Sequence, residues 1–162
     1  MDDLWIRRLT PADWRVWRAA RLASLADAPY AFGSTLAREE AFAEADWRRR
    51  LVPDAGMCAV AVLGDRTVGT IGAFTPPDAD TPLLVGMWVH PDARGHGAGD
   101  ALVGEVLTWA RERGDQRVEL RVADGNDAAR RLFLRNGFVA TGRREPLESA
   151  PTHGTEYLAR TF

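Results

Sequence analysis

The sequence predicts a mixed α/β fold in which helices cover both faces of a central sheet. Short apolar runs with strand spacing alternate along the chain with amphipathic stretches of helical period. The 162 residues suffice for one core, so we expect a single domain over residues 1–162. Apolar residues make up 46% of the chain and charged residues 27%, a balance typical of globular domains.

The N-terminal half carries a helix start and a hairpin. Thr10 can cap the helix, Pro11 suits its first position, and Asp13 stands where a capping-box acid belongs. Two apolar runs flank the segment 64–66, which predicts a β-hairpin. In chain order, we expect a strand over residues 5–9, helices over 10–26 and 36–51 with a loop over 27–34 between them, and strands over 57–63 and 67–74.

The C-terminal half alternates strands with helices. Three prolines predict a loop over residues 75–82, and the run after it is apolar on both faces, as in a central strand. Glycines close both helices, at Gly114 and Gly137. The expected elements are strands over residues 83–89 and 117–122, helices over 97–113 and 126–137, and strands over 138–143 and 156–162, with a proline-containing loop between the last two.

Composition excludes several classes of function. The net charge of -2 gives no electrostatic support for nucleic-acid binding. All 21 basic residues are arginine, which rules out chemistry that requires a lysine. Cys58 is the only cysteine and lies in an apolar run, so we expect a buried core residue, no internal disulfide and a cytoplasmic protein. No metal-ligand spacing, basic signal-peptide region or membrane-length apolar run is found.

The chemistry is expected at a glycine-rich loop, Arg94-Gly95-His96-Gly97-Ala98-Gly99, which joins a buried strand to a helix. Its glycines permit positive φ, its N–H groups can form a nest, and the helix start adds partial positive charge. With Arg94 this predicts a pyrophosphate site. A P-loop would need a lysine, and a dinucleotide fingerprint would need a glycine in place of Asp100.

The pattern Arg94-x-x-Gly97-x-Gly99, after a strand that ends in Val89-His90-Pro91, resembles the coenzyme A motif of the GNAT family of N-acetyltransferases. Residues 126–138, from a helix-opening asparagine to Gly-Phe, resemble the family's second motif, and residues 29–34 resemble its Pro-x-x-Phe-Gly-Ser loop. The resemblance implies a mostly antiparallel sheet with splayed central strands. It also implies an acetyl-CoA-dependent transfer of an acetyl group to the amine of a small molecule or a peptide.

The resemblance assigns cofactor roles residue by residue. Backbone groups of Trp88 and Val89 would pair with the pantetheine arm, loop N–H groups would hold the pyrophosphate, and Asn126 and Phe133 would lie along the arm and near the sulfur. Asn126 is equally explained as a helix cap, and Trp88 also as a core residue. The implied cofactor-binding residues are Trp88, Val89, Arg94, Gly95, His96, Gly97, Ala98, Gly99, Asn126 and Phe133, and the acceptor-side residues are Tyr30, Phe32 and Glu40.

Three departures from the family pattern concern catalysis. Phe133 stands where the family places a tyrosine that protonates the thiolate, which predicts a slower enzyme or another donor, such as water or Tyr157. Asp100 is an acid near the phosphates, which costs little if its side chain points away. The strand over residues 83–89 lacks the family's glutamate, so Glu39 and Glu40 are base candidates, with solvated surface acids as the alternative.

Without a firm base, the sequence favours acceptor amines of low pKa, such as α-amines and aryl amines. Two other functions remain open. Phe133 suits a non-catalytic coenzyme A-binding sensor or partner module, or an enzyme for longer acyl chains in which this ring lines the acyl pocket. An edge strand over residues 156–162 would allow a homodimer.

Overall fold

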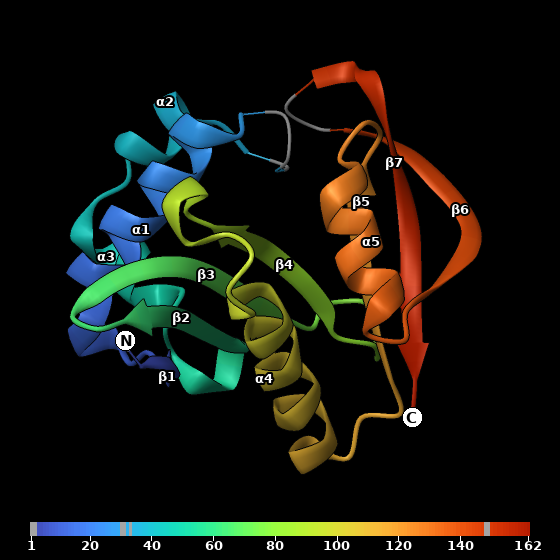
Figure 1. The fold of residues 1–162 in the computed structure, drawn as a ribbon, viewed down its shortest axis with the longest axis horizontal. Helices are drawn as coiled ribbons and strands as arrows, with labels where there is room; N and C mark the ends of the chain where they lie inside the picture. Colours follow the sequence, from blue (N-terminus) through green and yellow to red (C-terminus); the bar gives the residue numbers. More distant parts are fainter. Residues whose placement is uncertain (1–2, 30–31, 33, 148–149) are drawn as a thin grey trace.

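The computed structural model describes residues 3–29, 32, 34–147 and 150–162, and its strands form one seven-stranded sheet in the order β1-β2-β3-β4-β5-β7-β6 (Figure 1). The strands are β1 Leu4–Arg8, β2 Met57–Leu63, β3 Arg66–Phe74, β4 Leu83–Val89, β5 Arg117–Ala123, β6 Val139–Leu147 and β7 Ala150–Thr161. The helices are α1 Trp14–Asp27, α2 Leu36–Glu40, α3 Glu44–Arg49, α4 Ala98–Arg113 and α5 Asp127–Arg135. Short 3₁₀ turns are η1 Pro11–Asp13, η2 Pro53–Ala55 and η3 Pro91–Ala93. Only β4 and β5 pair in parallel.

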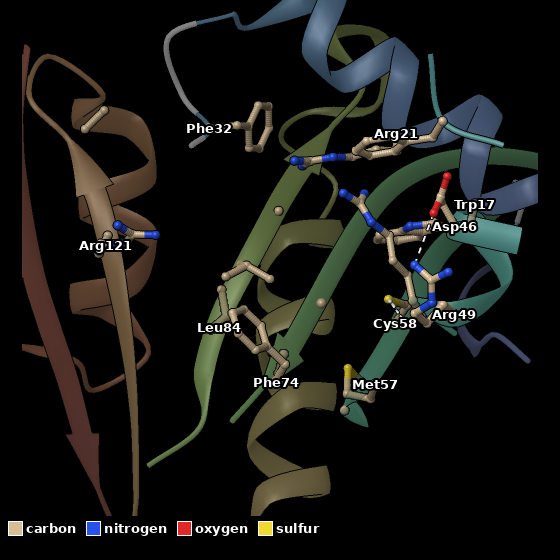
Figure 2. Close-up of a pocket in the computed structure, with 18 of the residues that line it drawn as sticks. Trp17, Arg21, Phe32, Asp46, Arg49, Met57, Cys58, Phe74, Leu84 and Arg121 are labelled. Atoms are coloured by element: carbon tan, nitrogen blue, oxygen red, sulfur yellow. Dashed lines mark hydrogen bonds and ion pairs between the residues drawn. The ribbon is translucent and has the colours of Figure 1, made fainter. Parts of the chain in front are cut away.

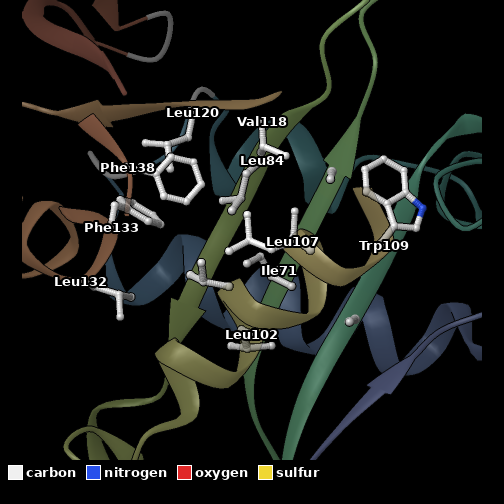
Figure 3. Packing of buried hydrophobic residues seen from close by; sticks show 14 of the residues in the cluster. Ile71, Leu84, Leu102, Leu107, Trp109, Val118, Leu120, Leu132, Phe133 and Phe138 are labelled. Atoms are coloured by element: carbon white, nitrogen blue, oxygen red, sulfur yellow. The ribbon is translucent and has the colours of Figure 1, made fainter. Parts of the chain in front are cut away.

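Helices cover both faces of the sheet, which confirms the predicted fold class. On one face α4 packs across β2, β3 and β4, and Leu102 and Phe133 share one apolar cluster with Leu120 of β5 (Figure 3). On the other face Trp17 of α1 and Trp47 of α3 pack on alternate residues of β2. Alternate side chains of β2 therefore pack into two different apolar cores, one on each face of the sheet. In Figure 1, α1 to α3 gather over the β1–β4 half, and α5 lies beside β5.

The central strands β4 and β5 separate soon after they meet. Their pairing is limited to Leu83 with Glu119 and Leu84 with Leu120. Beyond this point the register of β4 against β3 shifts, and Gly86 adopts a φ of 63°. The hydroxyl of Thr70 donates to the Gly86 carbonyl at 2.7 Å, which fixes this bulge. A bulge bends its strand, and here it opens the sheet between β4 and β5, as the splayed strands of the family would require.

Two predicted boundaries are wrong. The helix expected over residues 36–51 is two helices, because the Asp46 carboxylate accepts the Ala43 N–H at 2.9 Å and starts α3 anew. The loop expected between the last two strands is mostly hairpin, with Pro146 inside β6. An outer strand tolerates proline because one of its sides needs no ladder hydrogen bonds.

The predicted edge position of the last strand is also wrong. β7, which contains residues 156–161, pairs with β5 on one side and with β6 on the other. It is therefore interior, and the sheet's edges are β1 and β6. The argument for a homodimer through an edge at residues 156–162 loses its basis, because that strand has no free side.

Candidate active site

The glycine-rich loop follows β4 through η3 and opens directly into α4. Gly95 and Gly97 have φ values of 83° and 85°, and a side chain at either would meet nothing within 4 Å. Backbone conformation, not space, therefore requires glycine at both positions. Gly99 differs, because a Cβ there would lie 2.9 Å from Cδ2 of Leu132 on α5. Its role is the close packing of α4 on α5.

The loop has the properties of an anion site. Residues 94–97 are exposed at the N-terminus of α4, a helix of 16 residues whose first N–H groups have no partner within the helix. The left-handed glycines on either side of His96 allow successive backbone N–H groups to turn toward the same side. Ala98, the first residue of α4, is buried, so the helix start is held firmly against the core.

Arg94 holds the loop to α1. Its Nε donates to the Val89 carbonyl at 3.0 Å, and its Nη2 pairs with Asp27 at 2.9 Å. Asp27, the last residue of α1, also accepts the indole N–H of Trp88 at 2.9 Å. One carboxylate thus offsets the charge of Arg94 and fixes the loop beside β4. Its predicted phosphate contact remains a prediction.

Trp88 and Val89 present their backbones to opposite sides of β4. The His90 N–H donates to Val68 O of β3 at 2.7 Å. Because antiparallel pairs alternate, the backbone groups of Val89 face away from β3, and those of Trp88 face β3. The geometry therefore favours Val89 for the predicted pairing with the pantetheine arm. Trp88 is 5% exposed and packs with Leu25 and Phe32, as a core residue.

Asp100 points away from the loop, which is the condition under which an acid is tolerated there. Its carboxylate accepts two hydrogen bonds from Arg135, at 3.1 and 3.0 Å, and one from Asn136 at 2.9 Å. The hydrogen bonds from Arg135, followed by that from Asn136, lower the pKa of this carboxyl. Asp100 therefore joins α4 to α5 as a carboxylate.

A narrow crevice of about 40 Å³ runs where β4 and β5 part. Leu84 to Met87 line it from β4, and Asn126 and Phe133 line it from the start and middle of α5. The Asn126 side chain accepts the Ala129 N–H at 3.4 Å, so Asn126 caps α5 and also lines the crevice. Phe133 is 4% exposed and meets Phe138 edge-on at 5.9 Å. Its ring has no proton to donate.

A larger pocket of about 640 Å³ opens on the α1–α3 side of the sheet (Figure 2). It shares with the crevice the side chain of Phe32, the β4 segment 84–86 and Arg121 of β5. The two spaces therefore meet at the bulge of β4. Its further lining is partly apolar, from Trp17, Phe42, Met57 and Phe74, and partly cationic, from Arg21, Arg49 and Arg50.

The predicted surface acids behave differently. Glu40 is exposed and lines neither pocket, in line with a solvated acid. For Glu39 that interpretation is wrong, because its side chain is 0% exposed. Arg21 donates to it twice at 3.0 Å, and Arg50 once at 2.8 Å. Burial raises the pKa of Glu39, but the hydrogen bonds and charge of Arg21 and the charge of Arg50 outweigh it, and the net shift is downward.

Glu39 is thus an ionised ligand of two arginines and touches neither pocket, so the structure does not place it as a general base. Tyr157 also lines neither pocket, and its hydroxyl donates to Glu145 at 2.9 Å. Burial, then that hydrogen bond, raise the pKa of Tyr157. Its hydroxyl is held away from both spaces. Tyr30 lies outside the described residues.

The four pocket arginines were missed by sequence reasoning. Arg21, Arg49, Arg50 and Arg121 come from α1, the end of α3 and β5. The run 48–50 is the only local signal, and it does not show which guanidinium enters a pocket.

The single cysteine of the chain is buried. Cys58 is 9% exposed, and burial raises the pKa of its thiol to about 12, which confirms a core residue and not a nucleophile. In the described part of the chain, no group of three His, Cys, Asp or Glu side chains is arranged to hold a metal. No helix there has the length and apolar character to cross a membrane.

The loop, the crevice and the pocket all adjoin β4. The chain belongs to the acetyltransferase (GNAT) family, whose model matches residues 19–138. A mycothiol acetyltransferase of Beutenbergia cavernae is 44% identical over 63 residues, 39% of this chain and 21% of that protein. N-acetyltransferase 8B of Rattus norvegicus is 37% identical over 91 residues, 54% of this chain and 41% of that protein. The matches therefore span less than half the length of these relatives.

Solved structures share the fold over the whole chain. A ribosomal-protein-alanine N-acetyltransferase of Brucella melitensis has a TM-score of 0.79 at 21% identity, covering 98% of this chain and 99% of that one. A Salmonella typhimurium protein described with its cofactor acetyl-CoA has a TM-score of 0.75 at 19% identity, covering 98% and 94%. At these identities the likeness establishes the fold.

Proposed function

We propose that the protein is an acetyl-CoA-dependent N-acetyltransferase that acts on the amine of a small molecule or a peptide. One observation carries the proposal: the pocket and the crevice meet at the bulge of β4, the strand that leads through η3 into the anion-binding loop. Family membership and the acetyl-CoA described with the Salmonella relative support it. Both curated relatives named above are acetyltransferases by name.

The residues present fit this cosubstrate. The open cradle above Gly95 and Gly97 admits a pyrophosphate, because no protein atom lies where their side chains would be. Among the described residues, β4 beyond Leu84 has no partner in β5, so its edge can pair with the pantetheine amides. Acetyl-CoA then supplies an activated acyl group as a thioester at the bulge.

The acceptor enters from the α1–α3 side. Its uncharged amine attacks the thioester carbonyl, the C–N bond forms as the C–S bond breaks, and the amine's proton passes to the thiolate through water. Backbone N–H groups on the β4 edge polarise the carbonyl. Freeing an α-amine of its proton at pH 7 costs about 1 kcal/mol, against roughly 4–5 kcal/mol for a lysine-type amine. A site whose described lining holds no unpaired acid favours the former.

Phe133 favours a second candidate, a coenzyme A-binding module without catalysis. A positioned acid contributes roughly 10²–10⁴-fold to rate, but a thiolate with a conjugate pKa of about 8.5 leaves without one. We therefore expect slow turnover, not none. The acyl length, a cytoplasmic location and a homodimer stay predictions.

Thiol release from acetyl-CoA in the presence of an amine panel distinguishes the two candidates. Gly97→Glu places a carboxylate in the anion site, and Gly142→Glu on β6 is its matched control, because Gly142 has a φ of 86° and a Cβ there also meets nothing within 4 Å. We expect amine-dependent release by the wild type and Gly142→Glu and none by Gly97→Glu. Thiol release that no amine accelerates would contradict the N-acetyltransferase function.

A further inference from the structure

We propose that the acceptor amine carries a carboxylate, which Arg50 and Arg21 bind in the large pocket. The inference rests on the proposed function and adds the substrate class. It starts from the charge of the pocket, whose described lining includes four arginines and a single acid, Asp46. Asp46 pairs with Arg49 at 3.1 Å, which leaves the other three arginines without an acid in the lining.

Glu39, which does not line the pocket, pairs with two of these arginines. Its Oε1 accepts both Arg21 Nε at 3.0 Å and Arg50 Nη1 at 2.8 Å, and its Oε2 accepts Arg21 Nη2 at 3.0 Å. One carboxylate therefore serves two guanidiniums, and the cluster keeps one net positive charge. Arg21 is only 11% exposed, and charge in such a place is stabilised by a bound counter-charge.

Arg50 has donors left for a second carboxylate. Arg21 donates to Glu39 from Nε and Nη2, and Arg50 donates to it only from Nη1. Among the described residues, no acceptor bonds Arg50 Nε or Nη2. That edge of a guanidinium matches a carboxylate with two parallel hydrogen bonds. The rings of Phe42 and Trp47, 4.8 and 5.3 Å from the Arg50 guanidinium carbon, hold it in place.

The positive charge lies close to the point of transfer. A Cβ built on Gly86 would be 3.2 Å from Arg21 Nη1, so this nitrogen sits over the β4 bulge, where pocket and crevice meet. Arg121 reaches into the pocket from β5 on the opposite side (Figure 2). The ion pair that Arg121 forms with Glu145 is long, at 3.8 Å. The carboxylate and the reacting amine therefore belong to one small molecule, with few bonds between them.

The other residues that line the pocket favour an acceptor whose remaining part is apolar. Trp17, Phe42 and Phe74 contribute aromatic surface to a pocket of about 640 Å³. An amino acid with an apolar side chain, or an aminobenzoate, combines an amine, a carboxylate and an apolar body at this scale. A polyamine or another acceptor with a second positive charge is disfavoured by the same arginines.

The test is calorimetric titration of the coenzyme A-loaded protein with matched pairs of acid and amide: leucine and leucinamide, phenylalanine and phenylalaninamide, 4-aminobenzoate and 4-aminobenzamide. Each amide keeps the body and loses the negative charge, and in the aminobenzoate pair the amine is uncharged at neutral pH in both members. We expect at least one acid to bind about tenfold to a hundredfold more tightly than its amide, as loss of a charge-assisted pair predicts. Arg50→Gln should abolish this ratio, because it leaves Arg21 to neutralise Glu39.

Arg38→Gln is the matched control, since Arg38 is exposed on α2, neighbours Glu39 in sequence and lines neither pocket. It should keep the wild-type ratio. Equal binding of every acid and its amide, no binding of any acid, or an unchanged ratio in Arg50→Gln would each overturn the inference. Coenzyme A binding and amine-dependent thiol release are measured on the same samples. If these persist while the acid preference is absent, only the carboxylate inference fails.

Discussion

Replacement of Glu39 by alanine should cost far more than replacement of any exposed acid. Its carboxylate is fully buried and is the shared acceptor for Arg21 and Arg50. Removing it leaves Arg21, which is only 11% exposed, with two unsatisfied N–H groups and an uncompensated charge. Breaking a buried pair by deleting one partner costs about 3–5 kcal/mol. We expect that loss in the free energy of unfolding.

The expected shift is large enough for simple assays. In a chain of this length, 1 kcal/mol corresponds to a change in Tm of about 2–4 °C, so Glu39→Ala should lower Tm by about 6–20 °C. Urea denaturation followed by tryptophan fluorescence gives the free energy directly. Glu40→Ala is the control, because the adjacent Glu40 is exposed and should stay within about 0.5 kcal/mol of the wild type.

The pH dependence identifies the cause. The folded-state pKa of Glu39 lies below its ordinary value, so its contribution is fully present above the unfolded pKa of about 4.3. That contribution is lost as pH falls through the folded pKa. The stability gap between wild type and Glu39→Gln should therefore narrow below about pH 4. A Glu39→Ala protein as stable as Glu40→Ala at neutral pH would refute the reasoning.

Three further predictions address other parts of the structure. Phe133→Tyr should raise kcat by about tenfold or more, because it supplies a proton donor in the crevice, and unchanged kcat in the thiol-release assay would show that thiolate protonation is not limiting. Gly69→Ala should destabilise the fold by about 1–3 kcal/mol, because its Cβ would lie 2.8 Å from the Trp88 carbonyl oxygen. Gly72→Ala, whose Cβ contacts would be 3.5 Å or longer, should lower the free energy of unfolding by less in urea denaturation. The Cys58 thiol, with a pKa of about 12, should resist iodoacetamide at pH 8 until the protein unfolds, and rapid labelling of the native protein detected by mass spectrometry would contradict its burial.

Local chemistry explains which features could be predicted from sequence. The loop from Arg94 to Gly99 could be identified because positive φ is a property of single glycines and the helix start is adjacent in sequence. The capping-box acid Asp13 and the cap Asn126 were likewise predictable, since the side chain of each accepts an N–H three residues away.

Features that depend on distant partners could not be predicted. Glu39 resembles any exposed helix acid until Arg21 and Arg50, from two other segments, converge on it. Arginine is the only basic residue type in the chain, so composition does not single out the pocket arginines. The interior place of β7 follows from its pairing with β5, which involves residues about thirty to forty positions away in sequence and leaves no local mark.

The most direct test of the central claim is a calorimetric titration of the purified protein with acetyl-CoA. The wild type and Gly142→Glu should bind it, and Gly97→Glu should not, although circular dichroism should show all three folded. This result would assign the loop at the start of α4 as the coenzyme A site. A folded wild type that does not bind acetyl-CoA, or equal binding by Gly97→Glu, would contradict that assignment and the proposed function built on it.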